Sequence, residues 1–275
     1  MQKQLKSFDG TQINYDIVRV KNSEKFLIFL HGVGSDLTSW HKETVPFHKK
    51  GYSTLVLDMR GHGKSDRPET PQDYDLNNFA KDVFLIIKHE NIEKFVFVGH
   101  CFGAMVSMMF HKMYPKLAKS YILVDSTYKA PRSLRLIFHK NLFFVKLLNY
   151  FLIRSVDNKK IFGHNNFDKY VGTGDWNIQR IFADITHTSF KSWIFTYQNV
   201  AKFDAIDIMK KIKQRVLIVE GGRDSVISVL QAKKMHSLIQ NSELSIVPEA
   251  NHIIILNNPK ELEVEIYKFL KSLNF

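Results

Sequence analysis

Six short apolar runs alternate along the chain with segments whose apolar residues recur at helical spacing. Each run is four or five residues long and almost continuously apolar, which is typical of strands covered on both faces. Strands that alternate with helices predict a mostly parallel sheet with helices on both sides. The runs are Phe26–Leu30, Thr54–Leu57, Phe95–Val98, Tyr121–Val124, Val216–Val219 and Leu244–Val247.

Local signals also predict a hairpin and three of the helices. Two strand-like segments flank the turn dipeptide Asp9-Gly10 before the first apolar run. Helical spacing of apolar residues appears from Leu76 to Ile87, and again in a Met-rich segment that ends at Pro115. The last helix is predicted from Pro259, a residue suited to a first helical turn, to Leu273.

One stretch interrupts this alternation. About ninety residues separate the run Tyr121–Val124 from the run Val216–Val219, and they carry helical and irregular patterns without a convincing strand. Such a length exceeds an ordinary crossover connection. We expect a helical cap at 127–210, inserted into a core formed by 1–126 and 211–275, with no internal repeat or low-complexity tract.

Composition places the chain among ordinary folded proteins. Of its 275 residues, 44% are hydrophobic and 24% are charged, which excludes disorder of the whole chain. The net charge of +12 indicates long-range attraction of anionic molecules, but it does not indicate which chemistry the protein performs. No zinc-finger spacing or RNP-like aromatic motif accompanies this charge, so we expect no nucleic-acid partner. A single cysteine excludes an intrachain disulfide and a Cys-rich zinc site.

The beginning of the chain, MQKQLKSFDG, lacks the apolar stretch of a signal peptide. Charges interrupt every apolar run well before the roughly 20 residues that a membrane-spanning helix needs. A lone cysteine also fits a reducing compartment. We therefore expect a cytoplasmic protein.

Cys101 is the first candidate for chemistry. It lies at the centre of Gly-His-Cys-Phe-Gly at 99–103, directly after the predicted strand Phe95–Val98 and before the Met-rich helix. A sharp strand-to-helix turn exposes its central side chain above the sheet edge, and glycines two positions away allow close chain approach. The helix N-terminus then favours a thiolate or a developing oxyanion. A buried structural cysteine on a tight turn is the alternative.

This pentapeptide resembles the nucleophile elbow, G-x-S-x-G, of the α/β-hydrolase superfamily, with Cys101 in place of serine. The segment from His31 to Gly34, after the first parallel strand, resembles the superfamily's oxyanion loop. The segment Asp58–Asp66 resembles its D-x-R-G-x-G-x-S motif, which we interpret as structural, with His62 as a packed residue. The resemblance covers the whole chain and implies an α/β-hydrolase fold with an inserted helical cap.

The resemblance also implies a set of catalytic groups. The nucleophile, acid and base follow the chain order Cys101, Asp224, His252, which matches the order of this superfamily. His252 would move the proton, while Asp224 would hold the imidazole tautomer and stabilise its charge. Asp125 is the rival acid, because some relatives place that residue after the preceding strand.

Two backbone N–H groups complete the expected site. In the superfamily, one donor of the oxyanion hole comes from the loop after the His-Gly pair, here Val33. The other comes from the residue after the nucleophile, here Phe102. An ordinary glycine-rich turn is the alternative for the loop. The resemblance implies no metal and no organic cofactor, and the sequence names no substrate-binding residue.

The cysteine departs from most members that combine this loop pattern with a cap, since they use serine. Dienelactone hydrolases and polyhydroxyalkanoate synthases are relatives with a cysteine elbow, although neither resembles this chain well beyond it. A thiol is intrinsically nucleophilic, and it would give a thioester that reacts readily with thiols and amines. Asp at this position would indicate a dehalogenase or an epoxide hydrolase.

The resemblance therefore implies a hydrolase of the esterase or thioesterase type. Its expected partner is a small-molecule carboxylic ester or thioester, cleaved through a Cys-His-Asp triad and an acyl-thioester intermediate. An acyltransferase that uses the same intermediate is one alternative. A catalytically silent protein that binds a small ligand is another, although it has no need of all three catalytic residues.

The predicted cap contains a basic and strongly apolar stretch, Tyr128–Val156, that has six Lys or Arg residues and no Asp or Glu. Such a stretch fits an anionic membrane surface or an acidic carrier protein. Its apolar residues would alternatively line a tunnel for an acyl group. The simplest interpretation is a cap helix that packs its apolar face on the core and exposes its charges.

Overall fold

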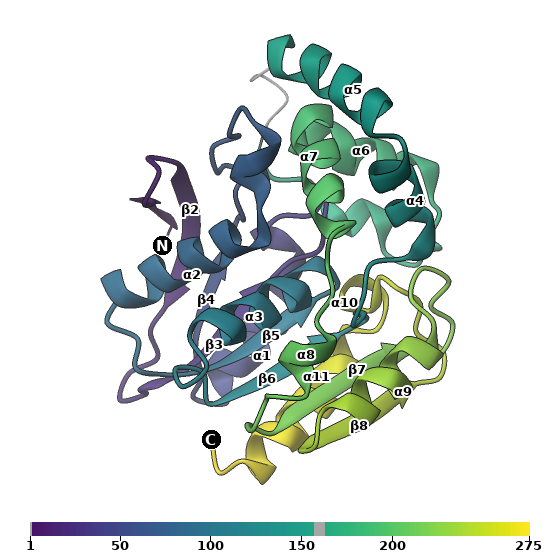
Figure 1. Ribbon diagram of the computed structural model, residues 1–275. Helices are drawn as coiled ribbons and strands as arrows, with labels where there is room; N and C mark the ends of the chain where they lie inside the picture. Colours follow the sequence, from purple (N-terminus) through teal and green to yellow (C-terminus); the bar gives the residue numbers. More distant parts are fainter. Residues whose placement is uncertain (1, 157–162) are drawn as a thin grey trace.

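An eight-stranded sheet forms the centre of the computed structural model, which describes residues 2–156 and 163–275 (Figure 1). Its strand order is β1-β2-β4-β3-β5-β6-β7-β8. The first hairpin pairs antiparallel, as does β2 with β4, and the other neighbours are parallel. The strands are β1 (Gln2–Lys6), β2 (Gln12–Val18), β3 (Lys25–Leu30), β4 (Ser53–Leu57), β5 (Lys94–His100), β6 (Ser120–Val124), β7 (Val216–Gly221) and β8 (Ser242–Val247).

Helices cover both faces of this sheet. The side chains of Phe26, Ile28 and Leu30 in β3 join the core beneath α2, α3 and α9, while Leu27 and Phe29 join the core beneath α1 and α11. This alternation follows from the two-residue period of a strand. The core helices are α1 (His41–Lys49), α2 (Leu76–His89), α3 (Phe102–Met113), α8 (Ile206–Met209), α9 (Val229–Leu238), α10 (Ile254–Asn257) and α11 (Pro259–Ser272), with 3₁₀ turns η1 (Leu37–Trp40) and η2 (Pro71–Tyr74).

The observed architecture confirms the predicted fold class, a mostly parallel sheet between two layers of helices. All six apolar runs lie in strands, and the segment around Asp9-Gly10 forms the turn of the first hairpin. The parallel strands β5, β6, β7 and β8 end at one edge of the sheet. Side chains that follow these strands are therefore brought close together.

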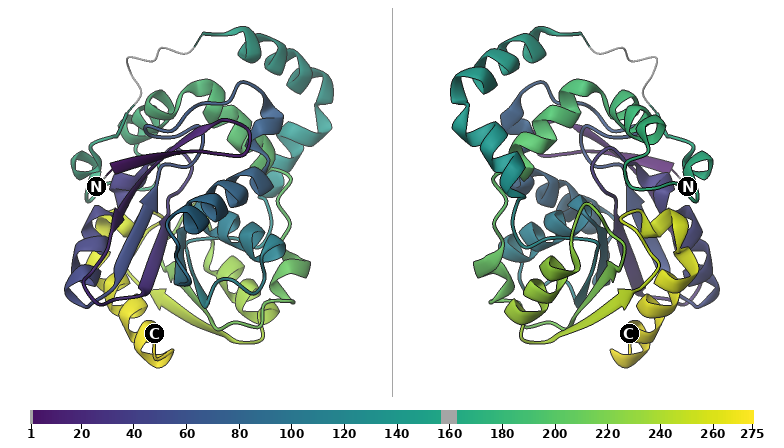
Figure 2. Two further views of the ribbon diagram at one scale, coloured as in Figure 1. Left: turned by 90° about the vertical axis from the view of Figure 1, so that its left-hand side faces the viewer. Right: turned by 90° about the vertical axis from the view of Figure 1, so that its right-hand side faces the viewer.

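Above this edge lies the helical part of the insertion (Figures 1 and 2). The chain leaves and returns through two paired segments, 128–130 and 203–205. The Ala130 N–H donates to the Phe203 carbonyl at 2.9 Å, and the Ala205 N–H donates to the Tyr128 carbonyl at 2.9 Å. The elements between them are α4 (Arg132–Lys140), α5 (Leu142–Arg154), η3 (Phe167–Tyr170), α6 (Ile178–Thr188) and α7 (Phe190–Val200).

The boundaries of the cap at 127 and 210 stay a prediction. Helix α8 lies inside this range of residues, yet it packs against α3 of the core. In Figure 1 it lies well below helices α4 to α7 of the cap. Within the described residues, no single helix is long and apolar enough to cross a membrane. The segments Arg132–Phe138 and Leu142–Arg154 are together long and apolar enough, but they are bent by 75° relative to each other.

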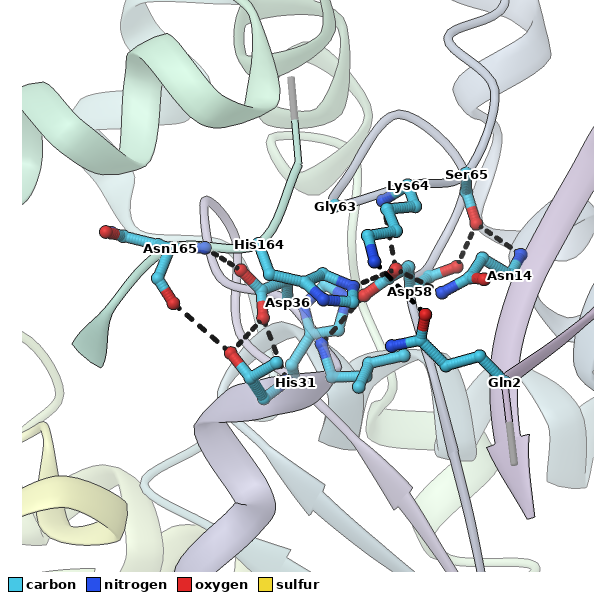
Figure 3. Close-up of polar contacts among 12 residues, drawn as sticks. Gln2, Asn14, His31, Asp36, Asp58, Gly63, Lys64, Ser65, His164 and Asn165 are labelled. Atoms are coloured by element: carbon cyan, nitrogen blue, oxygen red, sulfur yellow. Dashed lines mark hydrogen bonds and ion pairs between the residues drawn. The ribbon is translucent and has the colours of Figure 1, made fainter. Parts of the chain in front are cut away.

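A partly buried contact ties the insertion to the core. His164, between α5 and α6, approaches the Asp58 carboxylate with its Nε2 at 2.8 Å (Figure 3). Asp58 follows β4 and also accepts the N–H groups of Leu37, at 2.8 Å, and Lys64, at 2.9 Å. Burial alone would lower the pKa of His164, but the hydrogen bond and the charge of Asp58 outweigh it and raise that pKa. The raised pKa favours the charged imidazole beside the Asp58 carboxylate.

We expect the substitution His164→Gln, which keeps a donor but removes the charge, to lower the free energy of unfolding by about 1–2 kcal/mol near pH 6. Because the folded-state pKa of His164 is raised, its contribution is complete below the ordinary histidine pKa of about 6.5 and is lost as pH rises through the folded-state value. Urea unfolding near pH 6 and near pH 9 measures this difference.

His41→Gln, at an exposed position at the start of α1, is the control and should change stability little at either pH. A loss in His164→Gln that is equal at both pH values would contradict the assigned charge.

Candidate active site

Cys101 occupies a strained turn between β5 and α3. Its φ of +49° and ψ of −106° lie in a region that residues with a side chain rarely adopt. The backbone holds this conformation because the Cys101 N–H donates to the Val124 carbonyl of the neighbouring strand β6 at 2.8 Å. The side chain is partly exposed at the sheet edge, at the N-terminus of α3.

The two glycines that flank the turn are required by close backbone contacts. A Cβ at Gly99 would lie 2.5 Å from the backbone nitrogen of Ala104, and one at Gly103 would lie 2.1 Å from the Leu30 carbonyl oxygen. Both distances are too short for any real Cβ. The pattern of glycines around Cys101 is therefore a packing requirement of the turn.

The loop after β3 passes directly beside this turn. A Cβ built on Gly32 would lie 3.7 Å from the Cβ of Cys101, so the loop backbone is adjacent to the nucleophile candidate. Buried His31 orients the loop: its Nδ1 lies 2.8 Å from the Gly32 carbonyl oxygen, and its Nε2 accepts the Met59 N–H at 3.0 Å. These contacts fix the backbone immediately before Val33.

The backbone N–H groups of Val33 and Phe102 have no hydrogen-bond acceptor among residues 2–156 and 163–275. For Phe102 this follows from its position as the first residue of α3, where an N–H has no partner within the helix. Both donors therefore lie on segments that pass beside Cys101.

His252 and Asp224 meet on two neighbouring loops, after β8 and β7. The imidazole Nδ1 lies 2.6 Å from Oδ2 of Asp224. The other carboxylate oxygen, Oδ1, accepts the N–H groups of Val226 and Ile227, each at 2.7 Å, and this fixes its orientation. The His252 backbone is held as well, because its N–H donates to the Asp175 carboxylate of the insertion at 2.9 Å.

The same imidazole lies within hydrogen-bonding reach of Cys101. Burial by itself would lower the pKa of His252, but the charges of Cys101 and Asp224 and hydrogen bonds to both outweigh burial and raise that pKa well above its usual value. Since Nδ1 is engaged by Asp224, Nε2 is the nitrogen that faces the sulfur. The structure thus brings together Cys101, Asp224 and His252.

Two further carboxyl groups lie beside Asp224. Asp125, the rival acid, is buried, and its Oδ1 accepts the Gly221 N–H at 2.8 Å. Burial, together with the charge of Asp224, raises the pKa of Asp125 well above its usual value. Burial also raises the pKa of Glu220 to about 10, with the charges of Asp125 and Asp224 adding to the effect. Asp224 is the carboxylate that contacts the His252 imidazole, while Asp175 binds the His252 backbone N–H.

His100 is a site residue that sequence reasoning did not identify. Its Nε2 lies 2.8 Å from the backbone carbonyl oxygen of His252, so it donates a hydrogen bond that links the nucleophile turn to the loop of the base. Burial lowers the pKa of His100 to about 3, and the charge of His252 lowers it further. This residue is consequently neutral, and its role in the fold is to hold the two segments at a fixed spacing.

The insertion contributes residues that no motif indicated. Asp184 of α6 lies against the oxyanion-loop segment, since a Cβ at Gly34 would be 2.8 Å from the Cβ of Asp184. Burial raises the pKa of Asp184 to about 7, and Arg180 pairs with it at 2.9 Å. Tyr197 of α7 is close enough to Cys101 for the charge of Cys101 to raise its pKa, after the larger effect of burial.

His62 lies in the loop after β4 as a packed residue. Its Nδ1 is 2.9 Å from the Arg60 carbonyl oxygen. Burial lowers its pKa to about 3, and the nearby His31 lowers it further. Arg60 itself is fully buried and pairs with Asp82 and Asp9. This segment is therefore held by structural contacts, as the sequence predicts.

Three groups of described side chains have the composition of a metal site. In the first two groups the protein already engages some of the ligand atoms: His252 is held by Asp224, and Asp36 accepts the Thr38 and Asn165 N–H groups. In the third group, both carboxylate oxygens of Glu220 lack a hydrogen-bond partner within the described residues. The groups are His100–Asp125–His252, Asp36–Asp58–His164 and Asp125–Glu220–Asp224.

The model of the alpha/beta hydrolase fold family matches residues 25–259. The chain belongs to this family. The match includes the nucleophile turn and the His252–Asp224 pair, together with the whole insertion between them. The family assignment confirms the resemblance found in the sequence, and it makes the chain a hydrolase-family enzyme.

Relatives and solved structures agree with this assignment. The hydrolase YugF of Bacillus subtilis is 23% identical to this alpha/beta hydrolase, and the alignment covers 96% of each chain. A hydrolase structure from Pseudomonas aeruginosa PA01 has a TM-score of 0.78 at 16% identity, covering 98% of both chains. An esterase from Exiguobacterium antarcticum has a TM-score of 0.75 at 18% identity, covering 98% of this chain and 100% of its own. At such identities the two structures show the fold.

Replacing Gly103 with alanine tests the packing at the turn of this alpha/beta hydrolase. The added Cβ forces α3 away from β3, so we expect Gly103→Ala to lower the free energy of unfolding by about 1–3 kcal/mol. A shift of about 1 Å at Cys101 would also reduce catalytic activity by about a hundredfold. Urea unfolding and an ester hydrolysis assay measure the two effects.

Gly174→Ala is the matched control, because a Cβ at Gly174 meets nothing within 4 Å. If both variants retained native stability and activity, the turn would not be constrained as described.

Proposed function

We propose that the protein hydrolyses a carboxylic ester or thioester through an acyl-thioester on Cys101. The observation that supports this most is the position of the His252 imidazole between the Asp224 carboxylate, at 2.6 Å, and the Cys101 side chain. An imidazole held on one side by a carboxylate and facing a nucleophile on the other is the arrangement of covalent acyl transfer. The name of the Exiguobacterium neighbour, an esterase, supports the choice of substrate class.

In the first half of the reaction, the sulfur of Cys101 attacks the carbonyl carbon of the substrate. The electron pair of the carbonyl bond moves to oxygen, where the N–H groups of Val33 and Phe102 stabilise the negative charge. Each such donor is worth about 3 kcal/mol in well-studied cases. As the carbonyl forms again, the bond to the leaving group breaks, and protonated His252 supplies its proton to the departing alcohol or thiol.

In the second half, water enters the position that the leaving group has vacated. Neutral His252 removes a proton from water while its oxygen attacks the thioester carbon. The second tetrahedral intermediate collapses to the free acid and releases the sulfur of Cys101, and the proton on His252 restores the starting pair. Asp224 stabilises the imidazolium at both stages and keeps Nε2 directed at the reacting atoms.

The raised pKa values of Asp125 and Glu220 support Asp224 as the acid of this mechanism. If all three carboxyl groups were ionised, their repulsion would favour protonation of one or two of them. Oδ1 of Asp224 accepts two backbone N–H groups, whereas Asp125 accepts a single N–H bond in a fully buried position.

Hydrolysis of p-nitrophenyl esters of graded acyl length tests the proposal. We expect turnover by the native chain and a loss of at least about a thousandfold in kcat/KM for Cys101→Ala, since the nucleophile is removed. A rapid-quench sample should show one acyl group on the peptide that contains Cys101, which is unambiguous because the chain has a single cysteine. Acylation at another residue, or full activity in Cys101→Ala, would contradict the mechanism.

Two matched variants separate the candidate acids in the same assay. Asp224→Asn should lose about a thousandfold or more in kcat, because the amide stabilises the wrong imidazole tautomer. Asp125→Asn should lose less than about threefold, since the raised pKa of Asp125 favours an uncharged carboxyl group, which the amide resembles. The reverse order would assign the acid to Asp125.

A further inference from the structure

Exposed apolar side chains are concentrated on one small part of the molecule. Ten of the twenty-one large apolar side chains exposed in the described residues lie within positions 136–156. Soluble surfaces seldom gather apolar groups in this way unless the patch binds something. We call these residues the cap surface: Leu136, Ile137, Leu142, Phe143, Phe144, Leu147, Tyr150, Phe151, Ile153 and Val156.

Helix α5 is anchored to the rest of the cap by its opposite side. Leu152 is buried and Leu148 is half-buried against the core cluster. The side chains of Asn149 and Gln198 exchange two hydrogen bonds, of 3.2 and 2.7 Å, which join α5 to α7. The inner side of α5 is therefore specifically packed, and its apolar outer side is left without a partner in the described chain.

The shape of the molecule presents this outer side to the surroundings. Figure 1 shows α5 at the extreme end of the cap, farthest from the sheet, and Figure 2 shows the same from two sides. Phe143 is 82% exposed. A protruding helix with aromatic side chains on its outer side can insert them into an extended, deformable surface more readily than it can fit into a rigid pocket.

Positive charge accompanies the apolar side chains. Arg132 and Arg135 on α4 and Lys146 and Arg154 on α5 are all exposed. The sequence has no Asp or Glu between Tyr128 and Val156, so this part of the cap contributes only positive charge to a molecule of net charge +12. A binding partner of complementary charge would therefore be anionic.

The dimensions of α5 indicate how it would meet a membrane. Its 13 residues span about 20 Å, less than the roughly 30 Å of a bilayer's hydrocarbon core. The bend of 75° between the two segments of the α4–α5 pair also prevents them from forming a single straight span. The helix therefore fits the interfacial region, where apolar side chains enter and basic groups meet lipid phosphates.

We propose that the cap surface binds an anionic lipid bilayer. A second copy of the chain fits less well, because it would bring two clusters of positive charge together. An acidic carrier protein would satisfy the charges, but it would need an apolar groove that encloses the convex outer side of α5. A bilayer supplies both an anionic plane and an apolar layer beneath it.

Sedimentation with lipid vesicles tests this proposal independently of catalytic activity. We expect the native chain to bind vesicles that contain about one third phosphatidylglycerol, and to bind pure phosphatidylcholine at least about tenfold more weakly. The double variant Phe143→Ser, Phe151→Ser should lose about tenfold or more in affinity, because it removes two exposed aromatic side chains from the apolar layer. Binding should also weaken as salt screens the charges.

The double variant Leu230→Ser, Val264→Ser is the matched control. It removes two exposed apolar side chains from α9 and α11 of the core, where Leu230 is 74% exposed, and should bind like the native chain. Circular dichroism and thermal unfolding check that both variants fold, and Lys146→Glu with Arg154→Glu provides a second variant that should lose binding to anionic vesicles.

Three results would overturn the proposal: no binding of the native chain to anionic vesicles, equal loss in the core control, or unchanged binding in the Phe143→Ser, Phe151→Ser variant. Light scattering that shows a dimer abolished by this variant, without vesicle binding, would assign the cap surface to a second copy. Binding to an acidic acyl-carrier protein in place of vesicles would assign it to a protein partner.

Discussion

The hydrogen bond between the His252 imidazole and the Asp224 carboxylate is the contact on which the proposed chemistry depends. It occupies Nδ1, leaves Nε2 facing Cys101, and supports the positive charge that buried His252 would otherwise lose. The three residues are far apart in the sequence but follow strands β5, β7 and β8, which end at the same edge of the sheet. The proposed chemistry therefore requires the fold to hold three loops at a fixed spacing at this edge.

Several buried hydrogen bonds hold these loops in place, and most of them join uncharged groups. The backbone bond from Cys101 to β6 fixes the nucleophile turn, and His100 joins it to the carbonyl of His252. Burial raises the pKa of Asp125 and of Glu220, and among these neighbouring carboxyl groups Asp224 is the one that bonds to the imidazole. The imidazole therefore has one well-defined carboxylate partner, Asp224.

The sequence predicted those features that local chemistry determines. Continuous apolar runs indicated strands buried on both faces, and the glycines around Cys101 indicated a tight turn at which chains approach closely. Other features depend on contacts between distant segments. In the sequence, His100 is an ordinary residue before the nucleophile, and Glu220 is a polar residue near the end of a strand. Only the fold shows that both are buried and interact with His252. The contact of His164 with Asp58 joins two loops that share no pattern. The sequence also did not predict which side of α5 is packed. Nearly all positions of this helix are apolar, so no polar side distinguishes its inner face from its outer face.

The proposed pairing of Cys101 with His252 is tested most directly by the rate at which iodoacetamide modifies Cys101 across about pH 5 to 9, in the native chain and in His252→Ala. The account predicts that the native thiol reacts much faster than a small free thiol near pH 6, because protonated His252 stabilises the thiolate, and that His252→Ala loses this advantage. Equal rates in the two proteins, with the pH dependence of a free thiol, would contradict it.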